Sequence, residues 1–318
     1  MYTIGIDLGG TNIAVGLCDE ELRIVDKGSV PTLAEREGEE IVKDMAALTM
    51  KIVERNSLSL ADIDYVGIAA PGCINSDAGI VEYTNNIKMS DFPLVEIFKK
   101  YCPVERVYIA NDANAAALGE ALAGVGKGMP TLVMITLGTG VGGGVILDGK
   151  IFAGGKNPGG TELGHTVISA GGRQCSCGRR GCWEAYSSAT ALIRMTKEKI
   201  AECEAEGRYT VMSKAERISG RTACDAMRAG DEAGKEVYDK YVKYLAAGLT
   251  NMINIFQPQV ISLGGGVSNE GQSLIDALIP QIRAEQYGGS FLAEKELTEI
   301  RIAKLGNDAG IIGAAALA

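Results

Sequence analysis

The sequence predicts an α/β protein of about two domains, and three observations lead to this expectation. Short apolar segments, which are typical of strands, alternate along the chain with amphipathic or alanine-rich segments, which are typical of helices. Glycine supplies 42 of the 318 residues, above its usual share of about 7%, and it gathers where strands are expected to end. A chain of this length also has the size of about two domains.

The first half of the chain is expected to be rich in strands. Apolar residues fill five short segments that we predict as strands: 3–8, 13–18, 23–29, 65–70 and 107–110. Between the third and fourth of these, apolar residues at positions 41, 45, 48 and 52 fall on one face of a helix. The alanine-rich segment 113–122 predicts another helix, directly after the fifth strand.

The second half continues the alternation. We predict strands at 132–137, 144–147, 260–263 and 300–303. Residues 187–256 are expected to be mainly helical, 274–282 predict a further helix, and a short terminal helix is expected from Asp308.

One internal repeat is present in the sequence. Segment 4–11 can be laid over segment 133–140, because each combines an apolar strand with a glycine turn. The match favours duplication of one fold, which would place the two turns opposite each other across a cleft. Chance similarity is the alternative, since an apolar strand followed by a glycine turn is common.

Three glycine clusters are candidate phosphate sites: Gly9-Gly10-Thr11, Gly138 to Gly144 (with Gly138, Thr139 and Gly140 as the candidate ligands) and Gly264-Gly265-Gly266. Without a Cβ, backbone N–H groups can converge on an anion. Tight turns at strand ends are the structural alternative. Segment 138–143 also fits the dinucleotide pattern G-x-G-x-x-G, but a strand follows it where that motif must open a helix, which argues against NAD. Segment 124–128 lacks the spacing of a Walker A loop.

A metal site is predicted around the single histidine. His165 precedes a run in which three cysteines fall within eight positions, Cys175, Cys177 and Cys182. One imidazole and three thiolates form a Cys₃His set, which is typical of a closed structural zinc site. Three clustered but reduced thiols are the alternative. The other five cysteines are scattered and are expected to be ordinary apolar residues in a reducing compartment.

Four carboxylates are candidates for chemistry. Asp112 follows a strand and precedes a helix, so capping that helix is its structural alternative. Glu162 and Glu184 are close in sequence to the metal ligands, and two carboxylates held there suit the hydroxyls of a sugar; solvated loop charges are the alternative. Asp7 adjoins the first glycine turn, where it either caps the turn or contacts a phosphate-bound Mg²⁺ through water.

Composition excludes several classes of protein. With 46% hydrophobic and 22% charged residues, the chain is not expected to be disordered. A net charge of −9 argues against nucleic acid and anionic membranes as partners. The first residues have no basic and apolar signal segment, and no apolar stretch reaches the roughly 18 residues of a membrane helix, so we expect a cytoplasmic location.

These motifs resemble those of the ROK kinases, particularly the bacterial ROK glucokinases. The resemblance runs from residue 4 to the end of the chain, and its most specific part is Glu162-Leu163-Gly164-His165 with the cysteine run and Glu184. The remaining segments that resemble the family are Asp7 to Asn12, Ala70-Pro71-Gly72, Asn111 to Asn114, Leu137 to Gly144, Gly264-Gly265-Gly266 and Asn307 to Gly310.

The resemblance implies an actin-like (ribonuclease H-like) fold with two lobes around a central cleft. The expected lobes are 1–112 plus 303–318, and 113–302 with the zinc site. Asp112 would be the general base that takes a proton from the sugar. The implied sugar-binding residues are Asn86, Asn111, Asp112, Glu162, His165 and Glu184. The implied nucleotide-binding residues are Asp7, Gly9, Gly10, Thr11, Asn12, Gly138, Thr139, Gly140, Gly264, Gly265 and Gly266.

The expected activity is ATP-dependent phosphorylation of a hexose, with glucose first and with ATP, Mg²⁺ and structural Zn²⁺ as cofactors. N-acetylmannosamine, fructose, allose and mannose are alternatives, because Lys88-Met89 stands where glucokinases often have Gly-Trp. A non-catalytic sugar sensor is the alternative of another class. A repressor is not expected, because the first motif begins at Asp7 and no DNA-binding domain precedes it. A zinc-ribbon module that binds nucleic acid is not expected in so acidic a chain. The family resemblance implies a homodimer or homotetramer.

Overall fold

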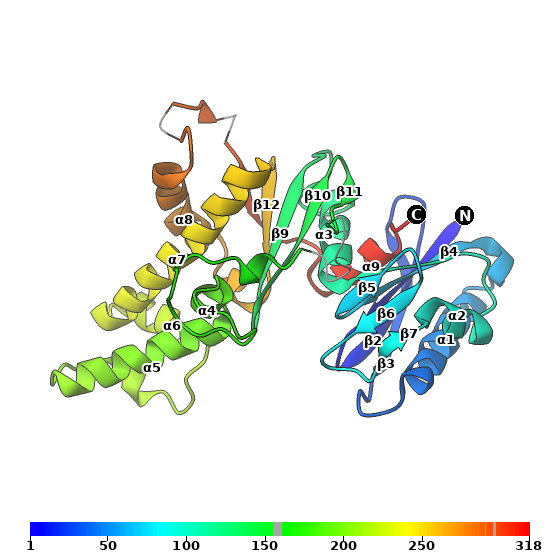
Figure 1. Cartoon of the computed structure of the whole chain (residues 1–318), viewed down its shortest axis with the longest axis horizontal. Helices are drawn as coiled ribbons and strands as arrows, with labels where there is room; N and C mark the ends of the chain where they lie inside the picture. Colours follow the sequence, from blue (N-terminus) through cyan, green and yellow to red (C-terminus); the bar gives the residue numbers. More distant parts are fainter. Residues whose placement is uncertain (155–160, 290, 295–296) are drawn as a thin grey trace. The chain divides into compact units, whose positions relative to one another are not determined.

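The computed structural model describes residues 1–154, 161–289, 291–294 and 297–318 (Figure 1). Contacts within the chain divide it into two compact units. The first unit comprises Met1–Leu132, Gly144–Thr161 and Lys304–Ala318, and the second comprises Val133–Gly143 and Glu162–Ala303. The lobe boundaries expected from the family resemblance stay a prediction.

The first unit is built on a five-stranded sheet in the order β3-β2-β1-β4-β8. Its strands are β1 (Tyr2–Leu8), β2 (Asn12–Cys18), β3 (Ile24–Pro31), β4 (Ile63–Ala70) and β8 (Val107–Asn111). Strands β1, β2 and β3 are antiparallel neighbours, whereas β1, β4 and β8 run parallel. Parallel strands end at one edge of a sheet, so the residues that follow β1, β4 and β8 lie along one edge.

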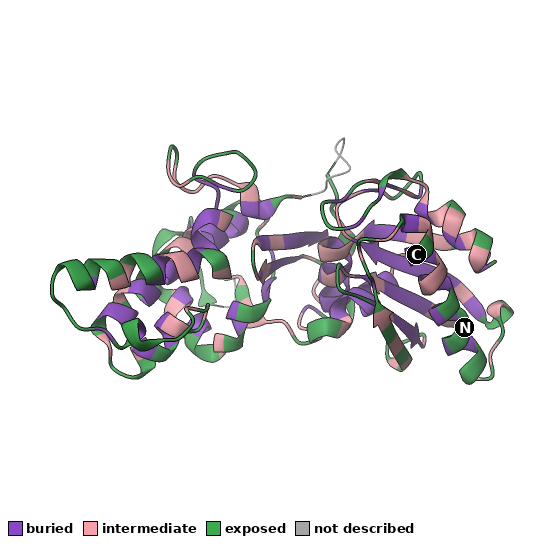
Figure 2. Cartoon of the chain, turned by 90° about the horizontal axis from the view of Figure 1, so that it is seen from below, coloured by how far each residue is buried: buried purple, intermediate pink, exposed green. Residues whose placement is uncertain are grey.

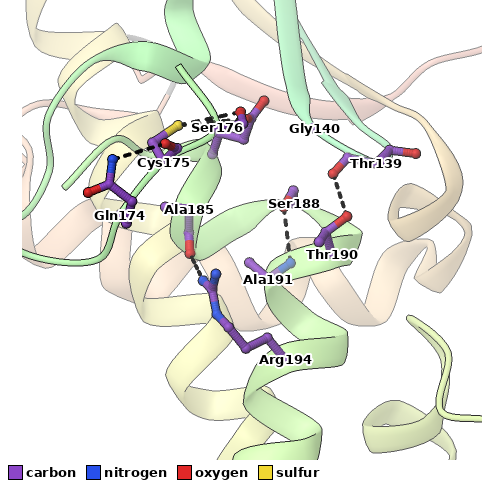
Figure 3. Close-up of a pocket in the computed structure, with 11 residues that line it drawn as sticks. Thr139, Gly140, Gln174, Cys175, Ser176, Ala185, Ser188, Thr190, Ala191 and Arg194 are labelled. Atoms are coloured by element: carbon purple, nitrogen blue, oxygen red, sulfur yellow. Dashed lines mark hydrogen bonds between the residues drawn. The ribbon is translucent and has the colours of Figure 1, made fainter. Parts of the chain in front are cut away.

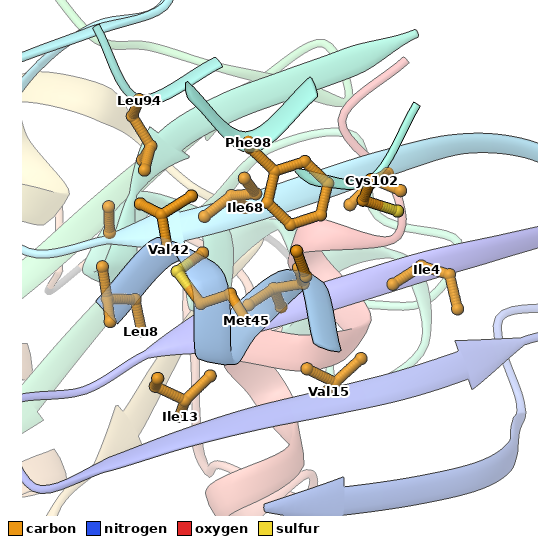
Figure 4. Close-up of a cluster of buried hydrophobic side chains, with 14 of the residues drawn as sticks. Ile4, Leu8, Ile13, Val15, Val42, Met45, Ile68, Leu94, Phe98 and Cys102 are labelled. Atoms are coloured by element: carbon orange, nitrogen blue, oxygen red, sulfur yellow. The ribbon is translucent and has the colours of Figure 1, made fainter. Parts of the chain in front are cut away.

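One face of this sheet is apolar and is covered by helix α1 (Gly38–Arg55) and helix α2 (Leu94–Tyr101). The residues at 41, 45, 48 and 52 are buried, as the helical periodicity predicts. Val42 and Met45 of α1 lie over Leu8, Ile13 and Val15 of the strands (Figure 4). Figure 2 shows that the strands are largely buried, in purple.

The other face is built from small residues. Alternation along β1 puts Ile4, Ile6 and Leu8 in the apolar core and turns Gly5 toward helix α9 (Ala309–Ala314). A Cβ on Gly5 would lie 1.9 Å from the carbonyl oxygen of Ile311. On β4, a Cβ on Gly67 would lie 1.8 Å from the carbonyl oxygen of Ala314. Backbone therefore packs directly on backbone, which only glycine permits.

A second five-stranded sheet has the order β11-β10-β9-β12-β13. Its strands are β9 (Leu132–Leu137), β10 (Val141–Leu147), β11 (Lys150–Ile151), β12 (Val260–Gly264) and β13 (Glu299–Ile302). The repeated strands β1 and β9 are central in their sheets, and β2 and β10 are their equivalent neighbours. Both sheets therefore contain the strand–turn–strand unit of the predicted repeat, whereas duplication and the facing of the two turns stay predictions. The α/β class is confirmed.

The remaining elements are mostly helices. The long region predicted as helical contains α4 (Glu184–Ser187), α5 (Ala189–Ala205), α6 (Thr222–Arg228) and α7 (Glu232–Phe256). Helix α3 is Asp112–Leu122, helix α8 is Gln272–Glu285, and a small sheet holds β5 (Cys73–Asn75), β6 (Ile80–Tyr83) and β7 (Ser90–Phe92). None of the helices in the described residues has the length and apolar character needed to cross a bilayer.

Helix α3 carries a fully buried carboxylate, Glu120. One oxygen accepts the N–H of Leu305 at 2.7 Å, and the other accepts the N–H of Val125 at 3.0 Å. Glu120 thereby joins the end of α3 to the segment that leads into α9. Both carboxylate oxygens are satisfied by backbone donors, so the buried charge is compensated locally.

Glu120→Gln is expected to lower the free energy of unfolding by about 2 kcal/mol, because its amide nitrogen would face a backbone N–H and leave a buried donor unsatisfied. Urea unfolding followed by circular dichroism measures the change. The exposed Glu54→Gln on α1 is the matched control. Equal midpoints for the two variants would contradict this role of Glu120.

Candidate active site

The first glycine turn, between β1 and β2, is held by Thr32. The Thr32 hydroxyl donates to the carbonyl of Gly9 at 2.6 Å, and its N–H donates to that of Thr11 at 2.8 Å. Gly9 in turn donates its N–H to the carbonyl of Asn12 at 3.0 Å. Carbonyl oxygens that accept protein hydrogen bonds are directed away from an anion, so the turn suits a phosphate. No sequence motif pointed to Thr32, which is fully buried after β3.

Asp7 and Asp112 lie at the same sheet edge, at the ends of β1 and β8. Burial, and next the negative charge of Asp112, raise the pKa of Asp7 from 3.8 to about 6. Asp7 also touches the start of α9, where a Cβ on Gly310 would lie 2.5 Å from its carboxylate. The structure thus brings Asp112, the predicted general base, close to Asp7, the predicted Mg²⁺ contact. Because the two carboxylates repel each other, a cation between them would be favoured.

The structural alternative for Asp112 is wrong, because Asn111 caps helix α3. The Asn111 carbonyl oxygen accepts the N–H groups of Ala113 and Asn114 at 3.0 and 3.2 Å, and its amide donates to the carbonyl of Gly72 at 3.1 Å. Asp112 is the first residue of the helix, and its carboxylate accepts the N–H of Ala113 at 2.8 Å. Much of the hydrogen-bonding capacity of Asn111 is therefore used within the protein, and its role toward a sugar stays a prediction.

Asn86 is exposed and lies beside the first glycine turn. A Cβ on Gly10 would lie 3.8 Å from the Cβ of Asn86. Two residues further on, Lys88 pairs with Glu37 at 3.1 Å, and Met89 is buried in the apolar core. The departure from the glucokinase pattern at 88–89 therefore places one side chain in an ion pair and the other in the core.

The second glycine turn, between β9 and β10, is held by the start of α5. The Ala189 N–H donates to the carbonyl of Gly138 at 2.8 Å, and the Thr190 hydroxyl donates to that of Thr139 at 2.7 Å (Figure 3). The Gly138 N–H closes the turn on the carbonyl of Gly140 at 3.1 Å. The carbonyls of 138 and 139 are thus directed to protein donors, as in the first turn.

Glu184 connects this turn to the cysteine-rich loop. One carboxylate oxygen accepts the N–H of Val141 at 3.1 Å, and the other accepts the hydroxyl of Ser176 at 3.0 Å. The carboxylate lines a pocket of about 440 Å³. Residues from the turn, the cysteine-rich loop and the start of α5 line the same pocket (Figure 3): Thr139, Gly140, Gln174, Cys175, Ser176, Ala185, Ser188, Thr190, Ala191 and Arg194.

The glycines of the third cluster differ in whether the fold requires them. Gly264 ends β12, and Gly265 has φ +84° with its Cβ position 2.6 Å from the backbone of Leu137, so this residue must be glycine for the fold. Gly266, in contrast, has open space where a Cβ would lie, and so does Gly138. Neither has φ in the left-handed region, so the fold itself does not require glycine at either position.

The predicted metal ligands come together in the structure. The ligand atoms of His165, Cys175, Cys177 and Cys182 all lie within 4.8 Å of one another. The His165 Nδ1 atom is 3.6 Å from Cys175 Sγ, and the sulfurs of Cys177 and Cys182 are 3.7 Å apart. Bonds of the usual zinc lengths in a tetrahedron give edges of about 3.6 Å for N–S and about 3.8 Å for S–S. The donor set and its spacing therefore fit a zinc ion.

The loop geometry around these ligands follows from the sequence. Gly178 and Gly181 have φ of +87° and +85°, which lets the cysteines turn toward one another. His165 ends the short 3₁₀ turn Leu163–His165, which exposed Glu162 precedes.

The predicted site residues fall into two groups, one in each unit. Those of the first unit are Asp7, Gly9, Gly10, Thr11, Asn12, Asn86, Asn111 and Asp112, and the others belong to the second unit.

A family model and several known proteins match this chain along its length. The model of the ROK family matches residues 3–318. A glucokinase from Thermotoga maritima is 35% identical over 315 residues, which cover 99% of this chain and 96% of that protein.

Two solved structures are also similar. A ROK family glucokinase from Streptomyces griseus, in complex with glucose and AMPPNP, has a TM-score of 0.76 at 34% identity, with 100% of this chain and 99% of that chain covered. A ROK hexokinase from Thermus thermophilus has a TM-score of 0.81 at 32% identity, with 100% and 98% covered. The expected actin-like fold is confirmed by these likenesses.

Asp7→Asn is expected to raise the free energy of unfolding at pH 7.5 by about 1–3 kcal/mol. The pKa of Asp7 is raised to about 6, so the folded state favours the protonated carboxyl. That stabilisation is complete at pH values below about 4 and is lost as the pH rises through about 6, whereas asparagine is neutral throughout. The midpoints of urea unfolding at pH 4.5 and 7.5 measure the gain of Asp7→Asn, and the exposed Asp77→Asn is the control. A gain that is the same at both pH values would contradict the assignment.

Gly138→Ala and Gly266→Ala are expected to change the free energy of unfolding by less than about 0.5 kcal/mol, because each new methyl group enters open space. Gly265→Ala should cost about 2 kcal/mol or more, because its φ is positive and its Cβ would meet the backbone of Leu137. Chemical denaturation of the three variants compares them. Equal losses in all three would show that the fold requires each glycine.

Proposed function

The chain belongs to the ROK family, and on this premise we propose that it is an ATP-dependent hexose kinase with glucose as its main substrate. The observation that carries the proposal is similarity over the whole chain to glucokinases, one of which has been solved with glucose and AMPPNP. The glycine turns and the carboxylates at the sheet edge support the same chemistry.

The proposed reaction is an in-line phosphoryl transfer. A sugar hydroxyl oxygen forms a bond to the γ-phosphorus of ATP, the bond from that phosphorus to the β–γ bridging oxygen breaks, and ADP leaves. The hydroxyl proton passes to the carboxylate of Asp112, the proposed general base. The cap that Asn111 provides supports this role, because helix α3 does not need Asp112 as its N-cap.

The proposed sugar ligands are polar groups from several segments: Asn86, Asn111, Asp112, Glu162, His165 and Glu184. Carboxylates and amides accept and donate hydrogen bonds to vicinal hydroxyls, which fixes the orientation of a polyol. Because the Nδ1 atom of His165 faces Cys175 Sγ, its Nε2 atom is the nitrogen proposed to bind a sugar hydroxyl.

The three glycine clusters are proposed to bind the nucleotide. Open Cβ positions at Gly138 and Gly266 let phosphate oxygens approach the backbone, so Gly138→Ala should weaken ADP binding without loss of stability. The two carboxylates Asp7 and Asp112 fit a hydrated Mg²⁺, which would neutralise phosphate charge. Zinc at the Cys₃His set is proposed to be structural, because four protein ligands close its coordination. We further propose a cytoplasmic homodimer or homotetramer, as the family resemblance implies.

Sugar identity is tested by coupled measurement of ADP release with glucose, N-acetylmannosamine, fructose, mannose and allose. We expect glucose to give the highest kcat/KM. A higher value with another sugar would reassign the substrate, and no release with any of the five would favour the non-catalytic sugar sensor.

Asp112→Asn is expected to lower kcat by at least about 100-fold, because a positioned general base contributes about 10²–10⁴-fold. Binding of glucose, measured by calorimetry, should be retained. Asp148→Asn, in an exposed turn of the same unit, is the matched control and should keep normal turnover. Near-normal kcat for Asp112→Asn would overturn the assignment of the base.

A further inference from the structure

The metal-ligand loop (residues 175–182) is hydrogen-bonded to the second glycine turn through a single carboxylate. Glu184 accepts the hydroxyl of Ser176 on one oxygen at 3.0 Å, and this oxygen lies 3.7 Å from the Sγ atom of Cys175. Its other oxygen accepts the N–H of Val141 at 3.1 Å. Val141 directly follows the turn, so only one side chain separates the metal-ligand loop from the turn.

The contact between this carboxylate and the turn is close. A Cβ on Gly140 would lie 2.3 Å from the Glu184 oxygen that binds Val141. The contact with Glu184 therefore requires glycine at position 140. At position 138, in contrast, a Cβ would enter open space. A side chain at position 140 would clash with Glu184, and a shift of the turn away from Glu184 would break the hydrogen bond from Val141.

Two further hydrogen bonds attach the turn to the segment of the chain that contains Glu184. The segment that begins at Cys182 continues through Glu184 and α4 into α5. Its residues Ala189 and Thr190 hold the carbonyls of 138 and 139, at 2.8 and 2.7 Å. One continuous segment therefore supplies a metal ligand, the carboxylate and both donors to the turn.

The position of this segment depends on the metal-ligand loop. Cys175 and Cys182, at the two ends of the loop, are buried in a small apolar cluster. Residues 176–180 between them are exposed and include Gly178 with positive φ, so apolar packing contributes little to the order of this middle part. Zinc binds cysteines as thiolates, and a cation among these three sulfurs, which lie within 4.8 Å of one another, attracts all three of them. The conformation of residues 175–182 is thus the one that an occupied site stabilises.

We propose that the metal-ligand loop positions the second glycine turn, with Ser176, Glu184 and Thr190 as positioning residues. An occupied metal site then fixes the turn through Glu184 and the start of α5, and it raises the affinity of the turn for the phosphates of a nucleotide. The part that concerns the nucleotide rests on the proposed kinase function, whereas the coupling between metal and turn does not.

Hydrogen exchange followed by mass spectrometry tests the coupling without substrate or nucleotide. The full-length protein is compared loaded with zinc and after removal of zinc by a chelator. We expect amides of peptide 137–143 to exchange at least about tenfold faster without zinc, because the Val141 N–H loses its fixed acceptor. Peptide 2–8 of the first unit is the internal control and should not change. Equal exchange of peptide 137–143 in both states, with unchanged circular dichroism, would overturn the proposal.

Substitution of Thr190 tests the same link in the zinc-loaded protein. Thr190→Val removes the hydroxyl bond to the carbonyl of Thr139 and should weaken ADP binding about fivefold, the effect of one lost hydrogen bond, with glucose binding unchanged. Thr298→Val is the matched control, because its hydroxyl also donates to a backbone carbonyl, that of Pro258, at 2.7 Å.

The outcomes separate this proposal from the proposed function. Equal ADP affinity of Thr190→Val and Thr298→Val would overturn the role of Thr190. If chelation unfolds the whole second unit, exchange in zinc-loaded Ser176→Ala, which removes the hydroxyl bond from the metal-ligand loop to Glu184, decides in its place: exchange of peptide 137–143 equal to that of the unsubstituted protein would overturn the proposal. A protein that phosphorylates none of the five sugars, yet shows zinc-dependent exchange at 137–143, would contradict the kinase assignment and support the coupling.

Discussion

The first unit depends on direct contact between the backbone of helix α9 and the two central strands of its sheet. Glycines at positions 5 and 67 remove the side chains that would separate helix from sheet. The alternation of β1 then places Asp7 on this same face, against the start of α9. The contact that closes the unit therefore buries a carboxylate at the edge where the chemistry is proposed.

Two acidic side chains of this unit are enclosed, and their surroundings differ. Glu120 is compensated by backbone N–H groups on both oxygens, so it serves the connection between α3 and α9. Asp7 has the negative charge of Asp112 nearby, which together with burial raises its pKa to about 6. A charge that the fold leaves uncompensated in this way is typical of a functional position.

The glycine turns of the two units follow one physical rule, although the donors have different origins. In each turn, carbonyl oxygens are bound by donors from another segment, which directs them away from an incoming anion. In the first unit, Thr32 donates these hydrogen bonds. In the second unit, Ala189 and Thr190 donate them. The second turn has in addition the hydrogen bond from Val141 to Glu184, and Glu184 also accepts the hydroxyl of Ser176 in the metal-ligand loop.

The sequence by itself determined features whose cause is local. The helical spacing at 41–52, the strand-turn repeat and the histidine with its cysteine run are each visible within a short segment, and the structure confirms them. The tertiary structure decided which residue caps α3, which donors bind the glycine turns and which carboxylate is compensated. Those outcomes join residues far apart in the chain, such as Glu120 with Leu305, and no periodicity or spacing records such a contact. Only the folded backbone, in which α9 packs directly on the glycines of the sheet, brings such distant residues within hydrogen-bond distance.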